Sequence, residues 1–291
     1  MEDPMEIKTH AKINLSLDVT GKREDGYHLL KMVMQSIELH DRVTLEPGGV
    51  GIRLTCNLPY VPLNDKNIAW QAASRFLSYN GIRDGMAIHL DKSIPVGAGL
   101  AGGSSNAAGI LLALNSMYGT PMSLPELQDM GLTLGADVPF TMQGGTALCE
   151  GIGEIITPLP DFSGITVLLV KPPFGVSTKK IFSAFKLDKV RRHPRTGQVI
   201  RGIRQKDLLR VSKNLGNILE NVTLNFHPEL HRIKSELKAK GALGSLMTGS
   251  GPTVFGIFDD EEKARAARDH FSGKYRETFL TRTIGTPATH V

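Results

Sequence analysis

The sequence has little cysteine and no long apolar segment. Cys56 and Cys149 are its two cysteines, which are too few for a disulfide framework or a four-cysteine zinc site. No apolar run approaches the ~18 residues of a membrane span. The first ten residues also lack the apolar stretch of a secretory signal. We therefore expect a cytoplasmic protein in a reducing compartment, without a membrane contact.

Low complexity and internal repeats are also missing. Hydrophobic residues make up 41% and charged residues 22% of the 291 positions, as in ordinary globular proteins. This length exceeds the roughly 100 to 200 residues of a typical domain, so we predict two domains with a cleft between them. The residue pattern changes after Asp161, which places an N-terminal domain at 1–160 and a C-terminal domain at 161–291.

Positive charge is concentrated in one segment. The net charge of the chain is +5, yet residues 186–206 hold eight Lys and Arg against Asp188 alone, a net charge of +7. Such a cluster can attract an anionic ligand or nucleic acid. The segment has no aromatic residue on which a base could stack. We therefore expect a solvated loop and no nucleic-acid partner.

The N-terminal part is predicted to be rich in strands. Apolar and polar residues alternate from Ala11 to Val19, which is typical of a half-buried strand with Lys12 and Asn14 on its polar face. Strands at 34–39 and 42–46 are expected to be joined by a tight turn at His40-Asp41, and 51–56 to extend this antiparallel set. Further expected elements are a helix at 67–79, a strand at 86–90, and helices at 106–118 and 123–134.

The C-terminal part has a different pattern. A continuous apolar strand is expected first, and four acidic residues at 259–262 favour a helix start, because negative charge stabilises a helix N-terminus. The order of these elements is similar to a split β-α-β sandwich. The expected elements are a strand at 165–170, a helix at 227–241, strands at 245–247 and 253–258, a helix at 259–270 and a strand at 277–284.

A glycine-rich segment, Pro95 to Ser105, lies between an expected strand and an expected helix. Successive glycines allow backbone N–H groups to face an anion, and a helix N-terminus adds partial positive charge, so the segment predicts a phosphate-binding loop. A Walker loop needs a lysine after its last glycine, but Ser104 follows Gly103. A Rossmann fingerprint needs an acidic residue that closes the second strand, and none stands there.

Four more motifs accompany this loop along the chain. They are Ala11-Lys12-Ile13-Asn14, Asp25-Gly26-Tyr27-His28, Gly135-Ala136-Asp137-Val138-Pro139 and Thr248-Gly249-Ser250-Gly251-Pro252-Thr253. Between Lys8 and Arg282 the set resembles the 4-diphosphocytidyl-2-C-methyl-D-erythritol (CDP-ME) kinases. These belong to the superfamily of galactokinase, homoserine, mevalonate and phosphomevalonate (GHMP) kinases.

The resemblance implies an α+β, two-domain GHMP kinase fold. Its N-terminal, ATP-binding domain would be a β-rich α/β domain (ribosomal protein S5 domain 2-like), and a C-terminal ferredoxin-like split β-α-β domain would complete the substrate cleft. The implied reaction is ATP-dependent phosphorylation of the 2-hydroxyl of CDP-ME, giving the 2-phosphate and ADP, in non-mevalonate (MEP) isoprenoid biosynthesis. Mg²⁺ is expected to accompany ATP, since it neutralises charge on the β and γ phosphates. The protein would be a monomer or a homodimer.

The resemblance also implies roles for residues around the acceptor. Lys12 and Asp137 would be the catalytic pair, with Asp137 taking the proton of the hydroxyl. Composition alone favours the alternative that Asp137 merely caps a turn between Gly135 and Pro139, and the resemblance reverses this. The substrate-binding residues would be Asn14, Tyr27, His28, Thr178 and Phe182, with Tyr27 and Phe182 on either side of the cytosine ring. Without the resemblance, Phe182 would be assigned to the core together with Ile181 and Phe185.

ATP would be bound by the glycine-rich loop and by an adenine pocket. The phosphate-binding residues would be Pro95, Val96, Gly97, Ala98, Gly99, Leu100, Ala101, Gly102, Gly103, Ser104 and Ser105. The adenine pocket would include Asn67, Ile68 and Lys92. No protein ligand of Mg²⁺ is assigned, and Ser105 is a candidate contact. The segment 248–252 would close the cleft from the C-terminal domain, or form a hairpin turn, and the two are compatible.

Two other functions compete with this one. A kinase for another small alcohol, of the homoserine or mevalonate type, is disfavoured by Tyr27, His28 and Phe182, since those acceptors have no ring to stack. A catalytically inactive nucleotide-binding sensor would be indicated by the loss of Lys12 or Asp137, and both are present.

Overall fold

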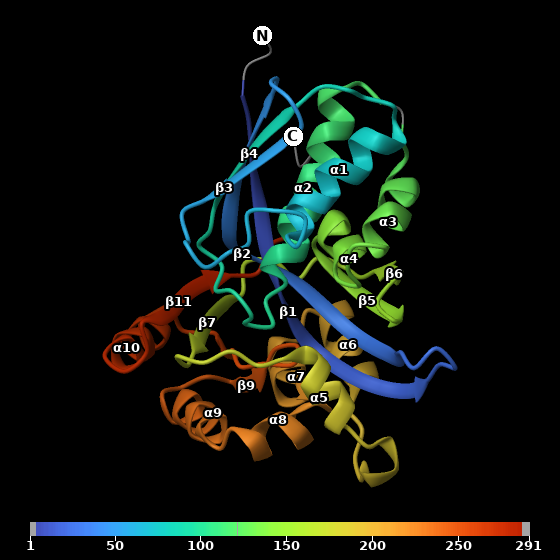
Figure 1. Ribbon diagram of the computed structural model, residues 1–291. Coiled ribbons are helices and arrows are strands. Elements are labelled where there is room, and N and C mark those ends of the chain that lie inside the picture. The colour runs from blue at the N-terminus through green and yellow to red at the C-terminus, as the bar shows by residue number, and fades with distance from the viewer. Residues whose placement is uncertain (1–3, 121, 287–291) are drawn as a thin grey trace.

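Two β-sheets form the framework of the computed structural model, which describes residues 4–120 and 122–286. The outermost residues of both predicted domains therefore lie outside the described residues. A seven-stranded sheet has the path β3-β4-β2-β1-β8, with β5 paired to β2 and β6 to β5. A four-stranded sheet has the order β11-β7-β10-β9. In Figure 1 the helices α1 to α4 lie in the upper half, and the smaller sheet and the later helices lie in the lower half.

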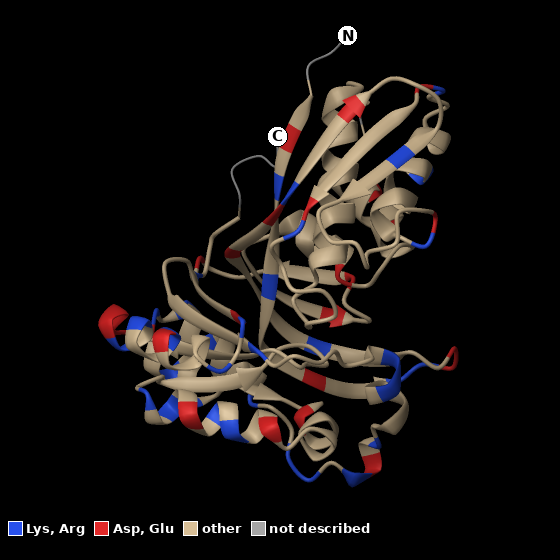
Figure 2. Cartoon of the chain, turned by 60° about the vertical axis from the view of Figure 1, so that its left-hand side comes forward, with Lys and Arg blue, Asp and Glu red and all other residues tan. Residues whose placement is uncertain are grey.

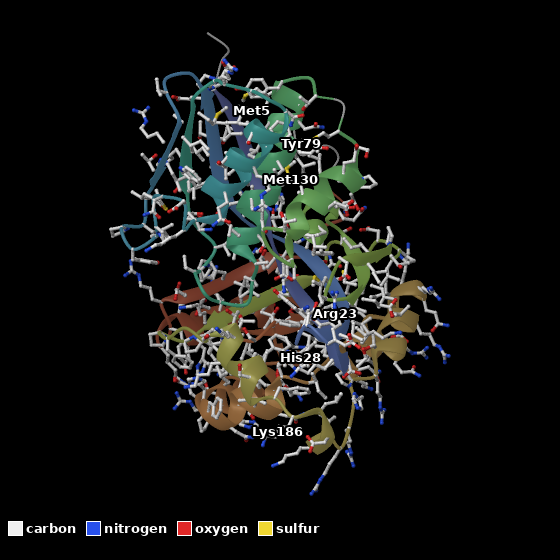
Figure 3. All side chains as sticks on the ribbon, turned by 45° about the vertical axis from the view of Figure 1, so that its right-hand side comes forward. Met5, Arg23, His28, Tyr79, Met130 and Lys186 are labelled. Carbon is white, nitrogen blue, oxygen red and sulfur yellow. The ribbon has the colours of Figure 1, made fainter. Side chains whose placement is uncertain are left out.

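Two long strands cross the middle of the molecule. Strand β1 (Met5–Lys22) pairs antiparallel with β2 (His28–Pro47), and both extend from the upper into the lower half (Figure 1). In Figure 3 the turn with Arg23 and His28 lies in the lower half, whereas Met5 lies in the upper half. The hairpin therefore forms part of the larger sheet and also extends beside the smaller sheet, where Ile37 pairs with Thr283.

The predicted strand at 11–19 is confirmed as part of β1, but the prediction that it is half-buried is wrong. Apolar and polar residues alternate, but Lys12, Asn14 and Ser16 are buried like their apolar neighbours. The polar face is covered because other segments pack on it and satisfy its polar groups. The Ser16 and Thr196 hydroxyls lie 2.7 Å apart, and the Asn14 backbone N–H donates to Thr248 Oγ1 at 3.1 Å. A polar face can therefore face the protein when another segment supplies hydrogen-bond partners.

The predicted turn at His40-Asp41 is also wrong. Both residues lie within β2, opposite His10 and Thr9 of β1, and the strand continues to Pro47. Asp41 is fully buried. Its carboxylate is satisfied by a loop that lies far from it in the sequence, so the polar pair does not mark a break in the strand.

Strand β3 (Ile52–Cys56) is parallel to β4 (Met86–Asp91) and does not extend the antiparallel set. The reason is the crossover helix α1 (Ile68–Tyr79), since parallel neighbours need such a connection. As predicted, α1 ends at Asn80, and Gly81 follows in the left-handed conformation (φ +66°).

The remaining helices of the upper half surround the glycine-rich segment. Helix α2 (Gly102–Met117) begins inside this segment, earlier than predicted. Helix α3 (Leu124–Leu132) begins with the predicted capping box of Ser123 and Glu126. Helix α4 (Val138–Gln143) and the hairpin of β5 (Thr146–Gly151) and β6 (Ile155–Pro158) were not predicted. Strand β5 pairs with β2.

The smaller sheet consists of the predicted strands β7 (Thr166–Lys171), β9 (Gly244–Met247), β10 (Val254–Phe258) and β11 (Glu277–Arg282). Helices α9 (Glu229–Ala239) and α10 (Glu261–Ser272) bury apolar residues such as Ile233 and Phe271. None of the helices in the described part of the chain has the length and apolar character of a membrane span. The cytoplasmic location stays a prediction.

The basic segment 186–206 is not a solvated loop. It contains a short 3-10 helix (Leu187–Lys189) and helix α6 (Thr196–Arg204), in which Val199 and Ile203 are buried while the Arg side chains are exposed. Apolar positions at helical spacing anchor the segment and leave its charge outside. Figure 2 shows many charged residues in the lower part of the molecule.

The chain between α6 and α9 connects the two sheets. It forms α7 (Leu208–Lys213), β8 (Gly216–Asn217) and α8 (Glu220–Phe226). Strand β8 pairs with β1, so the chain beyond residue 160 also contributes to the larger sheet. A division of the chain near residue 160 stays a prediction.

Candidate active site

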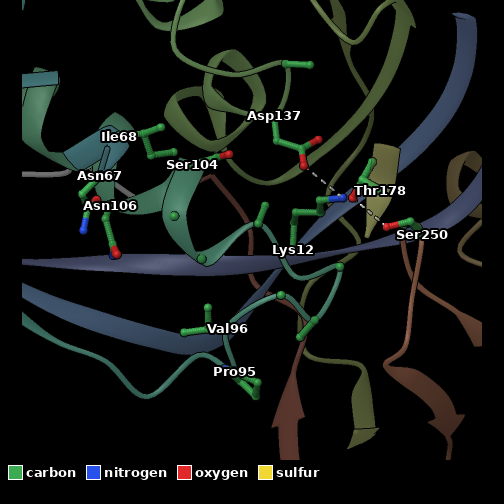
Figure 4. A pocket seen from close by; sticks show the side chains of 18 of the residues that line it. Lys12, Asn67, Ile68, Pro95, Val96, Ser104, Asn106, Asp137, Thr178 and Ser250 are labelled. Atoms are coloured by element: carbon green, nitrogen blue, oxygen red, sulfur yellow. Dashed lines mark hydrogen bonds and ion pairs between the residues drawn. The ribbon is translucent and has the colours of Figure 1, made fainter. Parts of the chain in front are cut away.

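A cavity of about 550 Å³ lies where β1 and β2 meet the glycine-rich segment. Its wall includes the segment from Lys92 to Ser104, residues before α1 and α4, helix α5 (Thr178–Ala184) and Ser250. Figure 4 shows these side chains converging on one space. Residues from the N-terminal and C-terminal parts of the chain therefore face the same cavity.

The glycine-rich segment has the geometry of an anion-binding loop. Gly97, Gly99 and Ala101 have φ values of +64°, +76° and +60°. Helix α2 then begins at Gly102, and no side chain caps it. The N–H groups of its first turn have no partner within the helix, and Gly102, Gly103 and Ser104 line the cavity. Free N–H groups and the helix dipole together form a site for a phosphate group.

A second glycine-rich turn supports this loop from the C-terminal part. Thr248 Oγ1 donates a hydrogen bond to the Gly99 carbonyl at 3.3 Å. A Cβ atom on Gly99 would lie 2.4 Å from the Thr248 carbonyl oxygen, so glycine is required here by close backbone packing. Ser250 of the same turn lines the cavity. The segment 248–252 thus closes the cavity from the C-terminal side, as expected.

Lys12 and Asp137 form an ion pair at this cavity. The distance from Lys12 Nζ to Asp137 Oδ2 is 3.5 Å, and the two side chains are 4% and 33% exposed. Asp137 stands at the N-cap position of α4, yet its side chain makes no capping hydrogen bond. The alternative that Asp137 merely caps a turn is therefore wrong. In Figure 4 its carboxylate points toward the Lys12 ammonium.

Asn14 holds the lysine in place. Lys12 Nζ donates to Asn14 Oδ1 at 2.9 Å, and the same oxygen accepts from the Gly249 N–H at 3.1 Å. Thr248 Oγ1 also lies 3.3 Å from this oxygen, and its one proton is shared between Asn14 and the Gly99 carbonyl. Asn14 is fully buried and does not line the cavity. The contact of Asn14 with a substrate therefore stays a prediction.

Cys149 is a nucleophile by residue type, but its environment makes it inert. It is fully buried in β5. Burial, with a further contribution from the Asp137 charge, raises the pKa of its thiol to about 12. The reactive thiolate is therefore absent at neutral pH.

At one end of the cavity, aromatic rings gather without forming a closed pocket. Phe182 lines the cavity, and its ring centroid lies 5.1 Å from that of His28. Tyr27 is 61% exposed, and no ring contact joins it to Phe182 in the described part of the chain. Thr178 lines the cavity, and its hydroxyl lies 2.8 Å from that of Ser250. The structure thus brings Thr178 and Phe182 to the cavity, whereas neither Tyr27 nor His28 lines it.

His28 is neutral at physiological pH. Burial, with a smaller contribution from the charge of Lys22, lowers the pKa of His28 from its ordinary value of 6.5. A neutral imidazole offers one donor and one acceptor. These are the groups that a hydrogen bond to an uncharged heterocycle needs.

At the other end, the three predicted adenine-pocket residues all line the cavity. Asn67 caps α1 by accepting from the Ala69 N–H at 3.0 Å. The Lys92 ammonium is bound by other side chains of the protein. Its ammonium forms an ion pair with the buried Asp41 and donates to Asn106 Oδ1 at 2.8 Å. The sequence analysis missed Asp41 because it assigned this acid to a turn.

The residues at the cavity fit a magnesium ion held mainly by the phosphates of ATP. The part of the chain that the structure describes has no cluster of three His, Cys, Asp or Glu side chains. Ser105, the predicted contact, is not suited, because its buried hydroxyl faces two backbone carbonyls. It donates to that of His10 at 2.6 Å, and that of Ala101 lies 3.1 Å away. Ser104 lines the cavity. Mg²⁺ usually takes few protein ligands beside nucleotide phosphates, and Ser104 would be such a ligand.

Comparisons with known proteins agree with this geometry. The family model for the GHMP kinases N terminal domain matches residues 67–145, and that for the GHMP kinases C terminal matches residues 199–277. The chain is 52% identical over 280 residues to the 4-diphosphocytidyl-2-C-methyl-D-erythritol kinase of Clostridium botulinum (strain Eklund 17B / Type B), covering 96% of this chain and 100% of the relative. The identity to the kinase of the same name from Clostridium beijerinckii is 51%, with the same coverage.

Solved structures give the same result. A crystal structure of 4-(cytidine 5'-diphospho)-2C-methyl-D-erythritol kinase aligns with a TM-score of 0.83 and 33% identity, covering 97% of this chain and 100% of that one. Homoserine kinase from Cytophaga hutchinsonii aligns with a TM-score of 0.77 at 19% identity, covering 98% and 96%, which shows a shared fold. The predicted α+β GHMP kinase fold is confirmed. The chain belongs to the 4-diphosphocytidyl-2-C-methyl-D-erythritol kinase family of the GHMP kinases.

Proposed function

We propose that the protein transfers the γ-phosphoryl group of ATP to the 2-hydroxyl of CDP-ME, giving the 2-phosphate and ADP in the MEP route to isoprenoid precursors. Membership of the family supports this reaction. The observation that carries it is the position of the Lys12–Asp137 pair. The pair faces the same cavity as the open N-terminus of α2 on one side and the Phe182 ring on the other.

Asp137 is the base that accepts the proton of the hydroxyl. Its carboxylate is partly exposed to the cavity and is free of capping bonds. The Lys12 ammonium, 3.5 Å away, orients this carboxylate and stabilises negative charge on the attacking oxygen. A positioned general base typically contributes about 10²- to 10⁴-fold in rate.

The phosphates of ATP lie along the glycine-rich loop. The N–H groups of Gly102, Gly103 and Ser104 at the start of α2 bind the phosphate oxygens through hydrogen bonds and the helix dipole. When bound, Mg²⁺ neutralises charge on the β and γ phosphates. Ser104 would hold the ion together with those phosphates.

The cytidine group occupies the end of the cavity where Phe182 and His28 lie. Phe182 offers one ring face, and neutral His28 offers a donor and an acceptor to the base. Tyr27 is exposed on a turn, so it can close over the base when the substrate is present. Stacking of this kind adds about 0.5 to 1.5 kcal/mol beyond burial. A small alcohol without a base would leave these rings without a partner.

An acceptor screen tests the function directly. The purified protein is incubated with ATP, Mg²⁺ and either CDP-ME, homoserine or mevalonate, and ADP release and the phosphorylated product are measured. Of the three acceptors, we expect only CDP-ME to be turned over, and we expect no turnover of CDP-ME by the matched Asp137→Asn variant. Faster turnover of homoserine or mevalonate, or ADP release that Asp137→Asn leaves unchanged, would contradict the proposal.

A further inference from the structure

Asp41 is a buried acid that the proposed chemistry does not use. Its carboxylate is fully buried in β2 and accepts four hydrogen bonds. Oδ1 accepts from the backbone N–H groups of Ser93 and Ile94 at 2.7 and 2.8 Å. Oδ2 accepts from the Lys92 ammonium and from Asn106 Nδ2, the latter at 3.0 Å. All four donors come from one stretch of the chain.

These donors stand at the two ends of the phosphate loop. Lys92, Ser93 and Ile94 come directly before Pro95, where the loop begins, and Asn106 lies in the second turn of α2, where the loop has ended. One rigid strand position therefore fixes both ends of the loop.

The network around Asp41 is closed and electrically neutral. Lys92 supplies the opposite charge, and Asn106 uses both of its polar atoms, because its oxygen accepts from Lys92 at 2.8 Å and its amide also donates to Thr9 Oγ1 at 2.8 Å. A buried network in which every group has a partner holds its members in one arrangement. The loop above it therefore keeps its shape without a ligand.

We propose that Asp41 is a positioning residue for ATP, which fixes both ends of the phosphate loop so that the N–H groups of α2 face the phosphates before ATP arrives. This inference rests on the proposed ATP site. A loop that is already ordered loses less conformational entropy on binding, and the affinity for ATP is higher for that reason.

The effect of Asp41 differs from general stabilisation of β2. Gln35 lies in the same strand and is also fully buried. Its side chain has three hydrogen bonds, but its partners are Ser36, Ile284 and Thr146. Its loss should lower thermal stability without changing the phosphate loop. Gln35→Leu is therefore a matched control for Asp41.

Two double variants separate the hydrogen bonds of Asp41 from its charge. Asp41→Asn with Lys92→Met removes the ion pair but keeps an oxygen for the N–H groups of Ser93 and Ile94. Asp41→Leu with Lys92→Met removes the same charges and also this oxygen. Affinity for the non-hydrolysable analogue AMP-PNP is measured by calorimetry without any acceptor, and unfolding is followed by circular dichroism.

We expect the leucine double variant to bind AMP-PNP at least tenfold more weakly than the asparagine double variant, while the KM values for CDP-ME agree within twofold. Gln35→Leu should bind AMP-PNP like the wild type. Equal AMP-PNP affinity in the two folded double variants would overturn the proposal. The proposal would also be overturned if the KM for CDP-ME of the leucine double variant rose by the same factor as its AMP-PNP affinity fell.

If the leucine double variant does not fold, Asn106→Leu tests the other end of the loop. It leaves the ion pair in place, and we expect a loss of AMP-PNP affinity of threefold or more. Unchanged affinity in folded Asn106→Leu would overturn the proposal. Failure of the proposed function is a separate result, because it would appear as absence of CDP-ME turnover by the wild type.

Discussion

The two ends of the cavity are built differently. At the ATP end, the loop is fixed by buried side chains such as Asp41, and Gly99 packs directly against the Thr248 carbonyl. At the acceptor end, Tyr27 is 61% exposed and Phe182 is half-buried beside His28. We therefore expect that the phosphate site is ordered before binding, whereas the base site is completed by its ligand.

The difference follows from the chemistry of the two ligands. Binding of a phosphate group depends on hydrogen-bond donors at fixed positions, and reorganising them at the moment of reaction would raise the barrier. A planar base needs two apolar faces, and an exposed tyrosine can supply one of them after the base has entered. The Lys12–Asp137 pair lies between these ends.

The largest effect is expected where the two ends meet. Asp137→Asn keeps the shape of the side chain but removes the proton acceptor, so kcat should fall by about 10²- to 10⁴-fold, while both KM values change little. Steady-state kinetics with ATP and CDP-ME measures this. Asp259→Asn, an exposed acid after β10, is the control and should keep the wild-type kcat. Retention of more than about a tenth of kcat in Asp137→Asn would show that proton transfer is not its role.

Lys12→Met should affect the ATP end as well. The lysine is close to Asp137 and, in the proposed reaction, also to the phosphate to be transferred, so kcat should fall and the KM for ATP should rise. If the pair acts as a unit, adding Lys12→Met to Asp137→Asn should lower kcat little further. A double-mutant cycle measures this coupling. Fully additive losses would mean that the two residues act independently.

Two glycines of the loop should respond differently to alanine. Gly97 has a φ of +64° and open space around its Cβ position, so Gly97→Ala costs about 1 to 2 kcal/mol of backbone strain. We expect about five- to thirtyfold weaker ATP binding. Gly99→Ala should in addition lower the Tm more, since its Cβ would clash with the Thr248 carbonyl. Calorimetry and thermal unfolding of both variants decide this, and an equal loss of Tm would speak against the packing argument.

A smaller effect is expected at the acceptor end. Tyr27→Ala removes about 1 kcal/mol of stacking, so the KM for CDP-ME should rise about fivefold while the KM for ATP stays unchanged. The Tm should also stay unchanged, because Tyr27 is exposed. Tyr27→Phe keeps the ring and serves as the control. An equal rise of both KM values would assign Tyr27 to the fold instead of the base.

The smallest effect concerns pH. His28 has a lowered pKa in the folded protein, so the unfolded state binds more protons once the pH falls below its ordinary value of 6.5. Acid should therefore lower the free energy of unfolding in this range, and the loss should level off below the folded pKa. In His28→Gln this part of the loss is absent, so denaturant unfolding at pH 7.5 and 5.5 should differ less than in the wild type. The same difference in both proteins would contradict the effect of burial on His28.

The sequence predicted the residues of the site better than their surroundings. Motifs identified the glycine-rich loop, Lys12 and Asp137. The fold brings these together because Lys12 of β1 lies next to the loop, where its backbone N–H donates to the Leu100 carbonyl at 3.1 Å. Regular periodicity also predicted α1 and the strands of the smaller sheet. Such patterns are local and remain readable without a structure.

The errors share a physical cause. The polar pair His40-Asp41 is typical of a turn. Asp41 lies in a buried strand because the N–H groups of Ser93 and Ile94, far along the chain, satisfy its carboxylate. The strand that carries Asn14 was expected to have an uncovered polar face, but Thr248 and Gly249 from the C-terminal part cover Asn14. Burial of polar groups by distant segments cannot be inferred from local alternation.

Hydrogen exchange of the free protein tests the difference between the two ends most directly. The amides of Ser93 and Ile94, which Asp41 binds, should exchange slowly without any ligand. The amides of the turn around Tyr27 should exchange fast until CDP-ME is added, and ATP should not slow them. Equally fast exchange of both segments in the free protein, or protection of Ser93 and Ile94 that appears only with ATP, would contradict a phosphate site that is ordered in advance.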